Sequence, residues 1–158
     1  MGHSVLSDRA MFRRTTMDLL EDHLSLVVPD PVLDAWLPGA MAEGRSPAEV
    51  AVLICHSQNQ LVAESWVESD LVASELAEMQ IADRIYESRK LLARHGGEAQ
   101  EVMSDLAGFV QQPCFSDEFR QMVANTLSWH EMVESRVASA DDQSSLKPPS
   151  ASPRLNPP

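Results

Sequence analysis

A long stretch without glycine or proline, residues 48–95, most constrains what this chain can fold into. Glycine and proline are the residues that interrupt helices most strongly, so we expect most of this stretch to be helical. A straight helix of that length would extend about 70 Å, since each residue adds about 1.5 Å, and this exceeds the diameter of a compact domain of 158 residues. We therefore expect the stretch either to break or to project, with residues 57–59 and Gln80 as the candidate breaks.

The apolar side chains of this stretch change face partway along it. On a helix of 3.6 residues per turn, one set lies on one side, namely Leu61, Val62, Trp66, Val72, Ala73, Leu76 and Met79. A second set, Ile81, Ala82, Ile85 and Leu92, lies roughly opposite. If the first set packs in the core, the second must meet a following helix or a second chain, whereas a break at Gln80 would allow one core to serve both sets. The residues predicted to form an interface are Trp66, Met79, Ile81, Ile85, Tyr86 and Leu92, because Trp, Met and Tyr are enriched at interface centres.

The rest of the chain has the pattern of shorter helices separated by proline and glycine. Ser46 and Glu49 match a capping box, with Pro47 at the first helical position, so the long stretch should start there and end at Gly96 and Gly97. The other helices are expected from after Ser7 to about Val27, from Asp30 through Trp36 with a corner at Pro38 and Gly39, over residues 99–110, and from Ser116 to about Ala140. These expectations define an all-α bundle of four to five helices with one long central helical run.

The end of the chain is predicted to be a disordered tail. Five of the last 11 residues are proline, and Leu155 is the one large aliphatic residue among those 11. Such a composition cannot bury enough apolar surface to offset the entropy of ordering the chain. The expected division is a helical bundle domain over residues 1–140 and a Pro/Ser-rich tail over residues 141–158.

The charge and the cysteines limit the class of protein. With 24 acidic and 12 basic residues, the formal net charge is −12, which repels DNA and RNA, so we expect no nucleic-acid partner. Cys55 and Cys114 are too few for a disulfide framework and indicate a reduced, cytoplasmic protein. No apolar stretch reaches the length that spans a membrane.

Two histidines stand out because each lies within an otherwise apolar helical face. His23 and His130 lie on different predicted helices, and Glu134 follows His130 by one turn. Inward histidines from separate helices are typical of a transition-metal or haem site in a bundle, although most buried histidines only hydrogen-bond to neighbouring groups. His3, His56 and His95 are interpreted as surface or boundary residues.

The function follows mainly by elimination. The sequence contains no phosphate loop, no Gly-x-Ser-x-Gly, no Gly-x-Gly-x-x-Gly and no Cys-x-x-Cys, so no enzyme class is indicated. An enzyme whose site is assembled from isolated residues is left open. We expect a small acidic helical protein-interaction subunit, regulatory, adaptor or chaperone-like, that contacts a protein partner or itself as a homodimer and needs no cofactor. The alternative is a cofactor- or metal-binding bundle that uses His23, His130 and Glu134.

Overall fold

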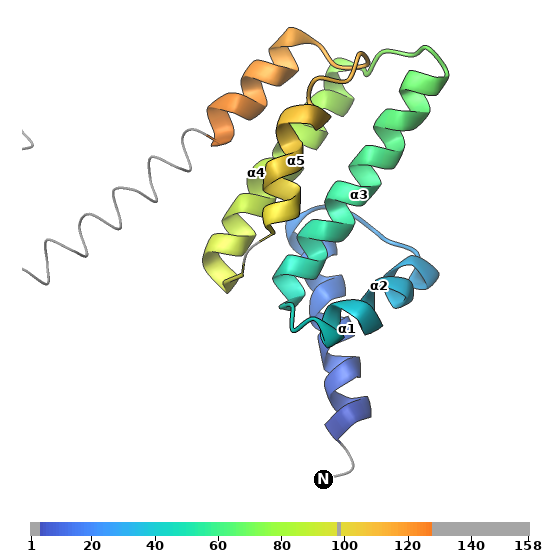
Figure 1. Cartoon of the computed structure of the whole chain (residues 1–158), viewed down its shortest axis with the longest axis vertical. Coiled ribbons are helices and arrows are strands. Elements are labelled where there is room, and N and C mark those ends of the chain that lie inside the picture. The colour runs from blue at the N-terminus through green and yellow to red at the C-terminus, as the bar shows by residue number, and fades with distance from the viewer. Residues whose placement is uncertain (1–3, 98, 128–158) are drawn as a thin grey trace, which may run out of the picture. The chain divides into compact units, whose positions relative to one another are not determined.

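The computed structural model describes residues 4–97 and 99–127 of this chain. The chain divides into two compact units, residues 1–123 and 124–158, and the description below concerns the first. The helices are α1 (Ser4–His23), α2 (Asp30–Ala42), α3 (Pro47–Glu68), α4 (Glu75–His95) and α5 (Gln100–Phe109), followed by a helical segment over residues 117–127 (Figure 1). The described residues contain no strand, which confirms the all-α class.

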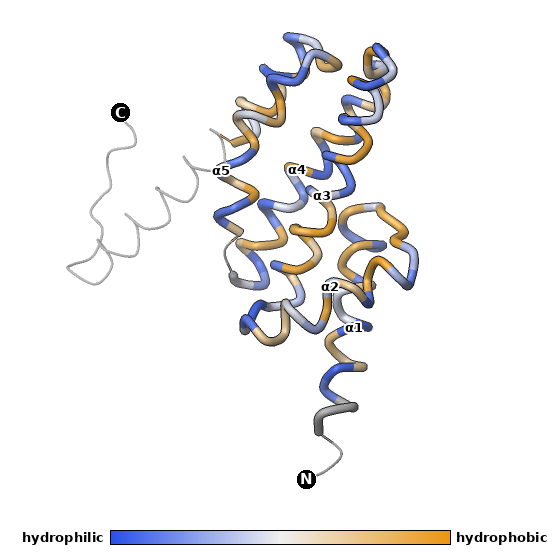
Figure 2. The backbone as a smooth tube through the Cα atoms, turned by 45° about the vertical axis from the view of Figure 1, so that its right-hand side comes forward, coloured by the Kyte–Doolittle hydropathy of each residue, from blue (hydrophilic) through white to orange (hydrophobic). Residues whose placement is uncertain are grey.

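Helix α3 is the central element of the first unit. It contacts α1, α2, α4 and α5, and its residues 50–55 are all buried, as expected for a helix surrounded by neighbours. The outer helices each bury one face instead, and Figure 2 shows hydrophobic and hydrophilic stretches alternating along them. The fully buried side chains that pack around the first half of α3 include Leu20, Leu24, Leu33, Leu37 and Leu91.

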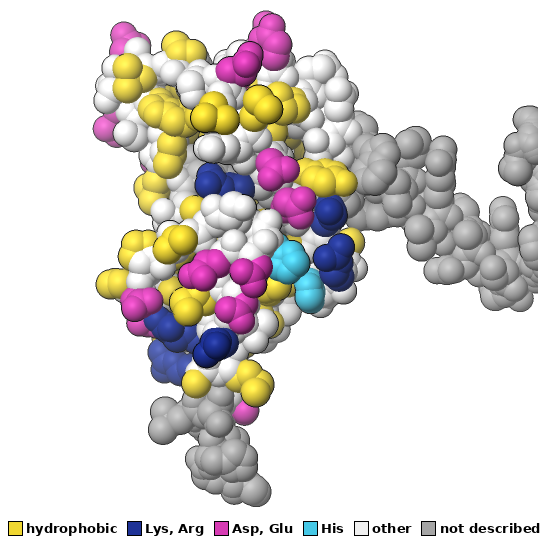
Figure 3. Space-filling view, turned by 180° about the vertical axis from the view of Figure 1, so that it is seen from behind, with side chains coloured by type: hydrophobic (Ala, Val, Ile, Leu, Met, Phe, Trp, Pro, Cys, Tyr) yellow, Lys and Arg dark blue, Asp and Glu magenta, His cyan; other side chains and the backbone are white. Residues whose placement is uncertain are grey.

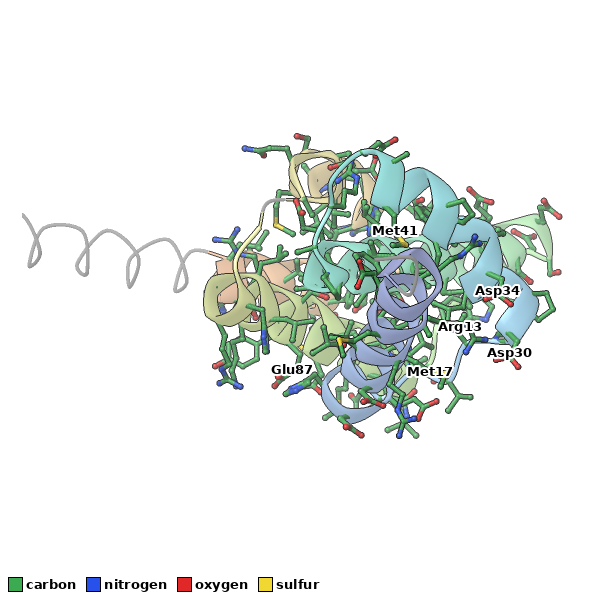
Figure 4. All side chains as sticks on the ribbon, turned by 90° about the horizontal axis from the view of Figure 1, so that it is seen from below. Arg13, Met17, Asp30, Asp34, Met41 and Glu87 are labelled. Carbon is green, nitrogen blue, oxygen red and sulfur yellow. The ribbon has the colours of Figure 1, made fainter. Side chains whose placement is uncertain are left out.

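Arg13 of α1 joins the first two helices. Its Nη2 lies 3.0 Å from Asp30 Oδ1, and its Nε donates to Asp34 Oδ1 at 2.8 Å, so both carboxylates of α2 flank one guanidinium (Figure 4). The bonds to Asp34 and then to Asp30 raise the pKa of Arg13. Since these groups are largely exposed to solvent, they orient α1 against α2 more than they stabilise the fold.

Two expected helix ends differ from the structure. Helix α1 stops at His23 rather than near Val27, because Ser25 adopts a left-handed conformation with φ of 51°. Val27 is consequently 79% exposed, and its neighbour Val28 is buried. Helix α2 has no corner at Pro38: it continues to Ala42, and Pro38 is tolerated inside it at the cost of one backbone hydrogen bond.

The long stretch does break, but at neither expected position. Helix α3 ends at Glu68 and α4 begins at Glu75, whereas residues 57–59 and Gln80 are helical. Asp70 takes the left-handed conformation, with φ of 59°, that glycine usually supplies at a helix end. The amide of Leu71 donates to the Trp66 carbonyl at 2.7 Å, and the amide of Asp70 donates to the Val67 carbonyl at 3.1 Å. This pair of bonds is a Schellman motif, made here without glycine.

The burial of the two apolar sets is the reverse of what the sequence predicted. Ile81, Ile85 and Leu92 are buried within this one chain, with exposures of 3%, 5% and 8%. The set that was expected to form the core is largely exposed, including Val72 at 73% and Leu76 at 65%. The second set therefore faces the core from α4, whereas most of the first set is exposed on the end of α3, on the turn and on the start of α4.

The start of α3 and the end of α4 agree with the sequence, whereas α1 starts at Ser4 rather than after Ser7 and the expected end of the last helix near Ala140 lies outside the described residues. The amide of Glu49 donates to Ser46 Oγ at 3.2 Å, and the amide of Ser46 donates to Glu49 Oε1 at 2.8 Å, which confirms the capping box. Helix α4 ends at His95, directly before Gly96 and Gly97. At Gly97, φ is 113° and an added Cβ would lie 2.6 Å from Glu49 Cγ, so this glycine lets the chain pass close to the capping box.

The last described helical segment is anchored by a buried carboxylate. Ser116 caps it by accepting from the Phe119 amide at 3.1 Å, as the sequence predicts. Glu78 of α4, only 5% exposed, accepts from the Ser116 amide at 2.7 Å and from Ser116 Oγ at 2.8 Å. The Glu78 carboxylate therefore has defined partners within the chain.

Candidate functional site

Exposed apolar side chains concentrate where α3 passes into α4. Figure 3 shows hydrophobic and acidic side chains together at this end of the first unit. Ten large hydrophobic residues are exposed among the described residues, and seven of them lie between positions 61 and 79. We call these seven residues the α3–α4 tip: Leu61, Val62, Val67, Leu71, Val72, Leu76 and Met79.

The tip is held from behind by the segment after α5. The amide of Ala73 donates to the Cys114 carbonyl at 2.9 Å, which ties the turn between α3 and α4 to that segment. Trp66 is half-buried, and its ring meets the Phe115 ring edge-on at 6.4 Å between centroids. Phe115 in turn stacks on Phe119 at 4.3 Å. Both phenylalanines are buried, so the exposed side chains of the tip stand on a packed aromatic base.

The second helix of the tip starts with its own cap. Ser74 Oγ accepts from the Ala77 amide at 3.1 Å, which satisfies one of the free amides at the start of α4. Leu76 and Met79 follow within the first turn and a half and remain 65% and 52% exposed. A capped helix start and a Schellman end fix the backbone on both sides of the turn.

The charged side chains of the α3–α4 tip are all acidic. Between Arg45 and Arg84 the chain has no lysine or arginine. Four exposed carboxylate residues stand among the apolar ones, namely Glu64, Glu68, Asp70 and Glu75. Their charges are not paired with cations of this stretch, so the tip combines apolar surface with a negative field.

The six residues predicted to form an interface do not share one surface. Met79 belongs to the tip, and Trp66 lies half-buried at its base. Ile81, Ile85 and Leu92 are covered by the chain itself, which removes the argument that they need a second chain. Tyr86 is half-buried, with Lys90 Nζ 5.1 Å from its ring centroid.

The predicted histidine site cannot be assembled from the described residues. His130 and Glu134 lie outside them. His23 is half-buried at the end of α1, where its ring meets the exposed ring of His95 edge-on at 6.1 Å between centroids. Within residues 4–97 and 99–127, no three His, Cys, Asp or Glu side chains gather closely enough to hold a metal ion.

His56 is a core residue rather than the surface residue that the sequence suggested. It is 9% exposed, its Nε2 lies 2.8 Å from Asp105 Oδ2, and its ring meets the Phe109 ring at 5.4 Å between centroids. Gln60 Nε2 donates to the same Asp105 oxygen. This cluster links α3 to α5 through satisfied polar groups, the usual state of a buried histidine.

Comparisons with protein families, with curated proteins and with solved structures found no match to this chain. Across the part of the chain that the structure describes, no helix is both long enough and apolar enough to cross a membrane.

The sequence contained a signal for the tip that helical periodicity alone concealed. Between positions 61 and 79 the acidic residues Glu64, Glu68 and Glu75 are interleaved with the apolar ones, and carboxylates are rarely buried without a partner. Burying the first apolar set would have drawn Glu64, Glu68 and Glu75 toward the core without partners. The charge pattern therefore pointed to the exposed face more reliably than the apolar spacing did.

Proposed function

We propose that this chain is a protein-interaction subunit, of a regulatory, adaptor or chaperone-like kind, that binds its partner through the α3–α4 tip. One observation carries this proposal: seven of the ten exposed large hydrophobic residues of the described chain lie in the short span 61–79. Scattered exposed apolar residues are normal on a protein surface, but a concentration on one element is typical of a contact surface.

The charge of the tip favours a basic partner. The exposed carboxylates Glu64, Glu68, Asp70 and Glu75 stand among the apolar residues, with no lysine or arginine between positions 46 and 83. Complementary charge speeds association and suppresses wrong partners. The partner should therefore present apolar side chains flanked by arginine or lysine, as one face of a basic amphipathic helix does.

A symmetric homodimer through the tip fits this surface less well. In a two-fold contact the same patch meets itself, so each tip would place its four carboxylates against those of the other copy. Like charges at an interface oppose binding unless a counter-charge intervenes. Self-association thus stays a prediction from the sequence, and so does the cytoplasmic location expected from the cysteines.

The proposal is tested by titrating the ¹⁵N-labelled protein with a synthetic amphipathic helical peptide of leucine and arginine. Amide shifts should localise to residues 61–79 and weaken as salt is raised, because screening removes the electrostatic part of binding. Leu76→Ser combined with Met79→Ser should weaken binding about tenfold or more, since both side chains are more than half exposed in the tip.

Val27→Ser provides the matched control. Val27 is 79% exposed but lies between α1 and α2, outside the tip, so this variant should bind as the unmodified protein does. Shifts spread evenly over the acidic surface, or equal binding by the Leu76→Ser, Met79→Ser variant, would count against the tip. A different outcome would be a dimer in light scattering that persists at high salt and that the same double variant dissociates. That result would identify a second copy of this chain, rather than a basic partner, as what binds the tip.

A further inference from the structure

A surface groove lies among α2, the first half of α3 and the start of α5, and none of its lining residues belongs to the α3–α4 tip. Its volume is about 510 Å³, within the range of roughly 300–1,000 Å³ common for small-molecule sites. Its apolar lining includes Trp36, Ala40 and Leu53. Ala40 and Leu53 belong to the buried core, and Trp36 is half-buried against it, so the apolar wall of the groove is held by packing.

The charged side of the groove carries two carboxylates and one guanidinium. Arg45 Nε lies 2.8 Å from Glu43 Oε1, and Arg45 Nη2 lies 2.5 Å from Glu101 Oε2. The Arg45 side chain is 23% exposed, whereas those of Glu43 and Glu101 are 62% and 51% exposed. The carboxylates therefore reach solvent more than the cation between them does, and the three groups together leave one negative charge.

Hydrogen bonding keeps Glu101 and Arg45 charged near neutral pH. A hydrogen bond from its own backbone, and then the bond from Arg45, lower the pKa of Glu101. The Glu43 and Glu101 bonds raise the pKa of Arg45, so the guanidinium keeps its proton as well. An incoming anion would meet two carboxylates and a guanidinium that is already engaged, whereas an incoming cation would meet the surplus charge.

We propose that this groove binds a small organic amine, with its apolar arm against Trp36 and Leu53 and its ammonium group beside Glu43 and Glu101. Trp is the aromatic residue that attracts cations most strongly, and the effect adds to burial of the apolar arm. The net charge of −12 raises the local concentration of such cations. This site uses none of the tip residues, so the amine-binding proposal does not depend on the proposed protein contact.

Two glycines make a direct test possible. A Cβ added at Gly39, which lines the groove, would meet no heavy atom within 4 Å, and the same holds at Gly108 of α5, which does not line it. Neither residue has the positive φ that would strain a larger side chain. Gly39→Phe should therefore fill part of the groove without disturbing the fold, and Gly108→Phe is the matched control.

The probe is phenethylamine, which joins an aromatic ring to an ammonium group by two methylenes. In a titration followed by amide shifts, the unmodified protein and Gly108→Phe should bind it alike, with changes around residues 36–45 and 101. Gly39→Phe should weaken binding about tenfold, and Glu101→Gln should weaken it several-fold while leaving the far-ultraviolet circular dichroism unchanged.

Several results would overturn the proposal. Equal binding of 3-phenylpropionate, which carries a carboxylate in place of the ammonium group, would show that charge does not select the ligand. Absence of saturable amide shifts with phenethylamine would show that the groove is not the site. The same conclusion would follow if Gly108→Phe weakened phenethylamine binding as much as Gly39→Phe does. Tighter binding of a Gly-Lys-Gly peptide than of the free amine would assign the groove to a polypeptide side chain instead.

Discussion

At the scale of single residues, burial rather than residue type decides what each side chain does. Ile85 and Met79 lie two turns apart on α4, yet Ile85 is 5% exposed and Met79 is 52% exposed. Glu75 and Glu78 share one acidic run, and only Glu78 is buried and bonded to Ser116. The sequence assigned Met79 and Ile85 to one predicted interface although it placed them on opposite helix faces, because the tertiary structure decides which face is covered.

Ile85→Asp should destabilise the first unit strongly. Placing a carboxylate at a buried apolar position without a partner is expected to lower the free energy of unfolding by about 3 kcal/mol or more. Met79→Asp, on the exposed side of the same helix, should change it by about 0.5 kcal/mol or less. Urea unfolding monitored by circular dichroism measures both. If the Ile85→Asp protein folds normally and only its oligomeric state is lost, Ile85 lies in an interface between chains, as the sequence suggested.

The Cys55 thiol should make stability fall at alkaline pH. Burial raises the pKa of Cys55 to about 11, from the ordinary value of 9.0 that it regains on unfolding. Its contribution is fully present below pH 9 and is lost as the pH rises toward 11, because only the unfolded chain ionises readily in that window. The loss should reach about 2 kcal/mol.

Cys55→Ala isolates this effect from the other groups that titrate at high pH. Cys114, whose pKa burial also raises, is present in both proteins and cancels in the comparison. The difference in free energy of unfolding between the two proteins, measured by urea denaturation from pH 8 to pH 11, should shrink as the pH rises. A difference that stays constant would mean that the Cys55 thiol is not buried as described.

At the scale of helices, short polar signals set the boundaries. The capping box at Ser46, the serine caps at Ser74 and Ser116 and the glycines after His95 stop or start helices as local chemistry requires. The end of α3 escaped detection because Asp70 supplies the left-handed conformation that is usually assigned to glycine. The turn at Asp70 thus divides the long stretch into two antiparallel helices, and this turn creates the tip.

Substitutions at Asp70 should reveal that conformation. Asp70→Gly removes the penalty for positive φ and should leave the free energy of unfolding unchanged or raise it by up to about 1 kcal/mol. Asp70→Val should lower it by about 1–2 kcal/mol, since a β-branched residue tolerates positive φ poorly. Urea midpoints with unchanged slopes measure both variants. Equal destabilisation by glycine and valine would indicate that the Asp70 side chain, rather than its backbone, maintains the turn.

At the scale of the whole molecule, charge is distributed unevenly along the chain. The net charge is −12, yet no lysine or arginine occurs between positions 46 and 83, while Arg9, Arg13 and Arg14 cluster near the start. The central hairpin of α3 and α4 therefore carries the negative field at its tip, and the cations of the hairpin lie on α4 from Arg84 onward, outside the tip. This arrangement is why the tip suits a basic partner and why a symmetric contact through it is disfavoured.

Removal of residues 141–158 should leave the thermal unfolding midpoint nearly unchanged. The segment contains five of the ten prolines of the chain and two large aliphatic residues, Leu146 and Leu155, so it offers little apolar surface to bury. A shift of about 1 °C or less is expected by calorimetry, since about 1 kcal/mol moves the midpoint of a chain of this size by several degrees. A drop of several degrees would show that these residues pack on the rest of the protein.

The sequence by itself determined the all-α class, the capping box that starts α3, the ends of α4 and α5, and the cap at Ser116. These features depend on residues a few positions apart, whose geometry is fixed locally. Only the tertiary structure decided that the Ile81–Leu92 face is buried, that His56 joins Asp105 and that Trp36 and Arg45 line one groove. Such pairings join residues far apart in the chain, and the packing free energy that selects them depends on all the helices at once.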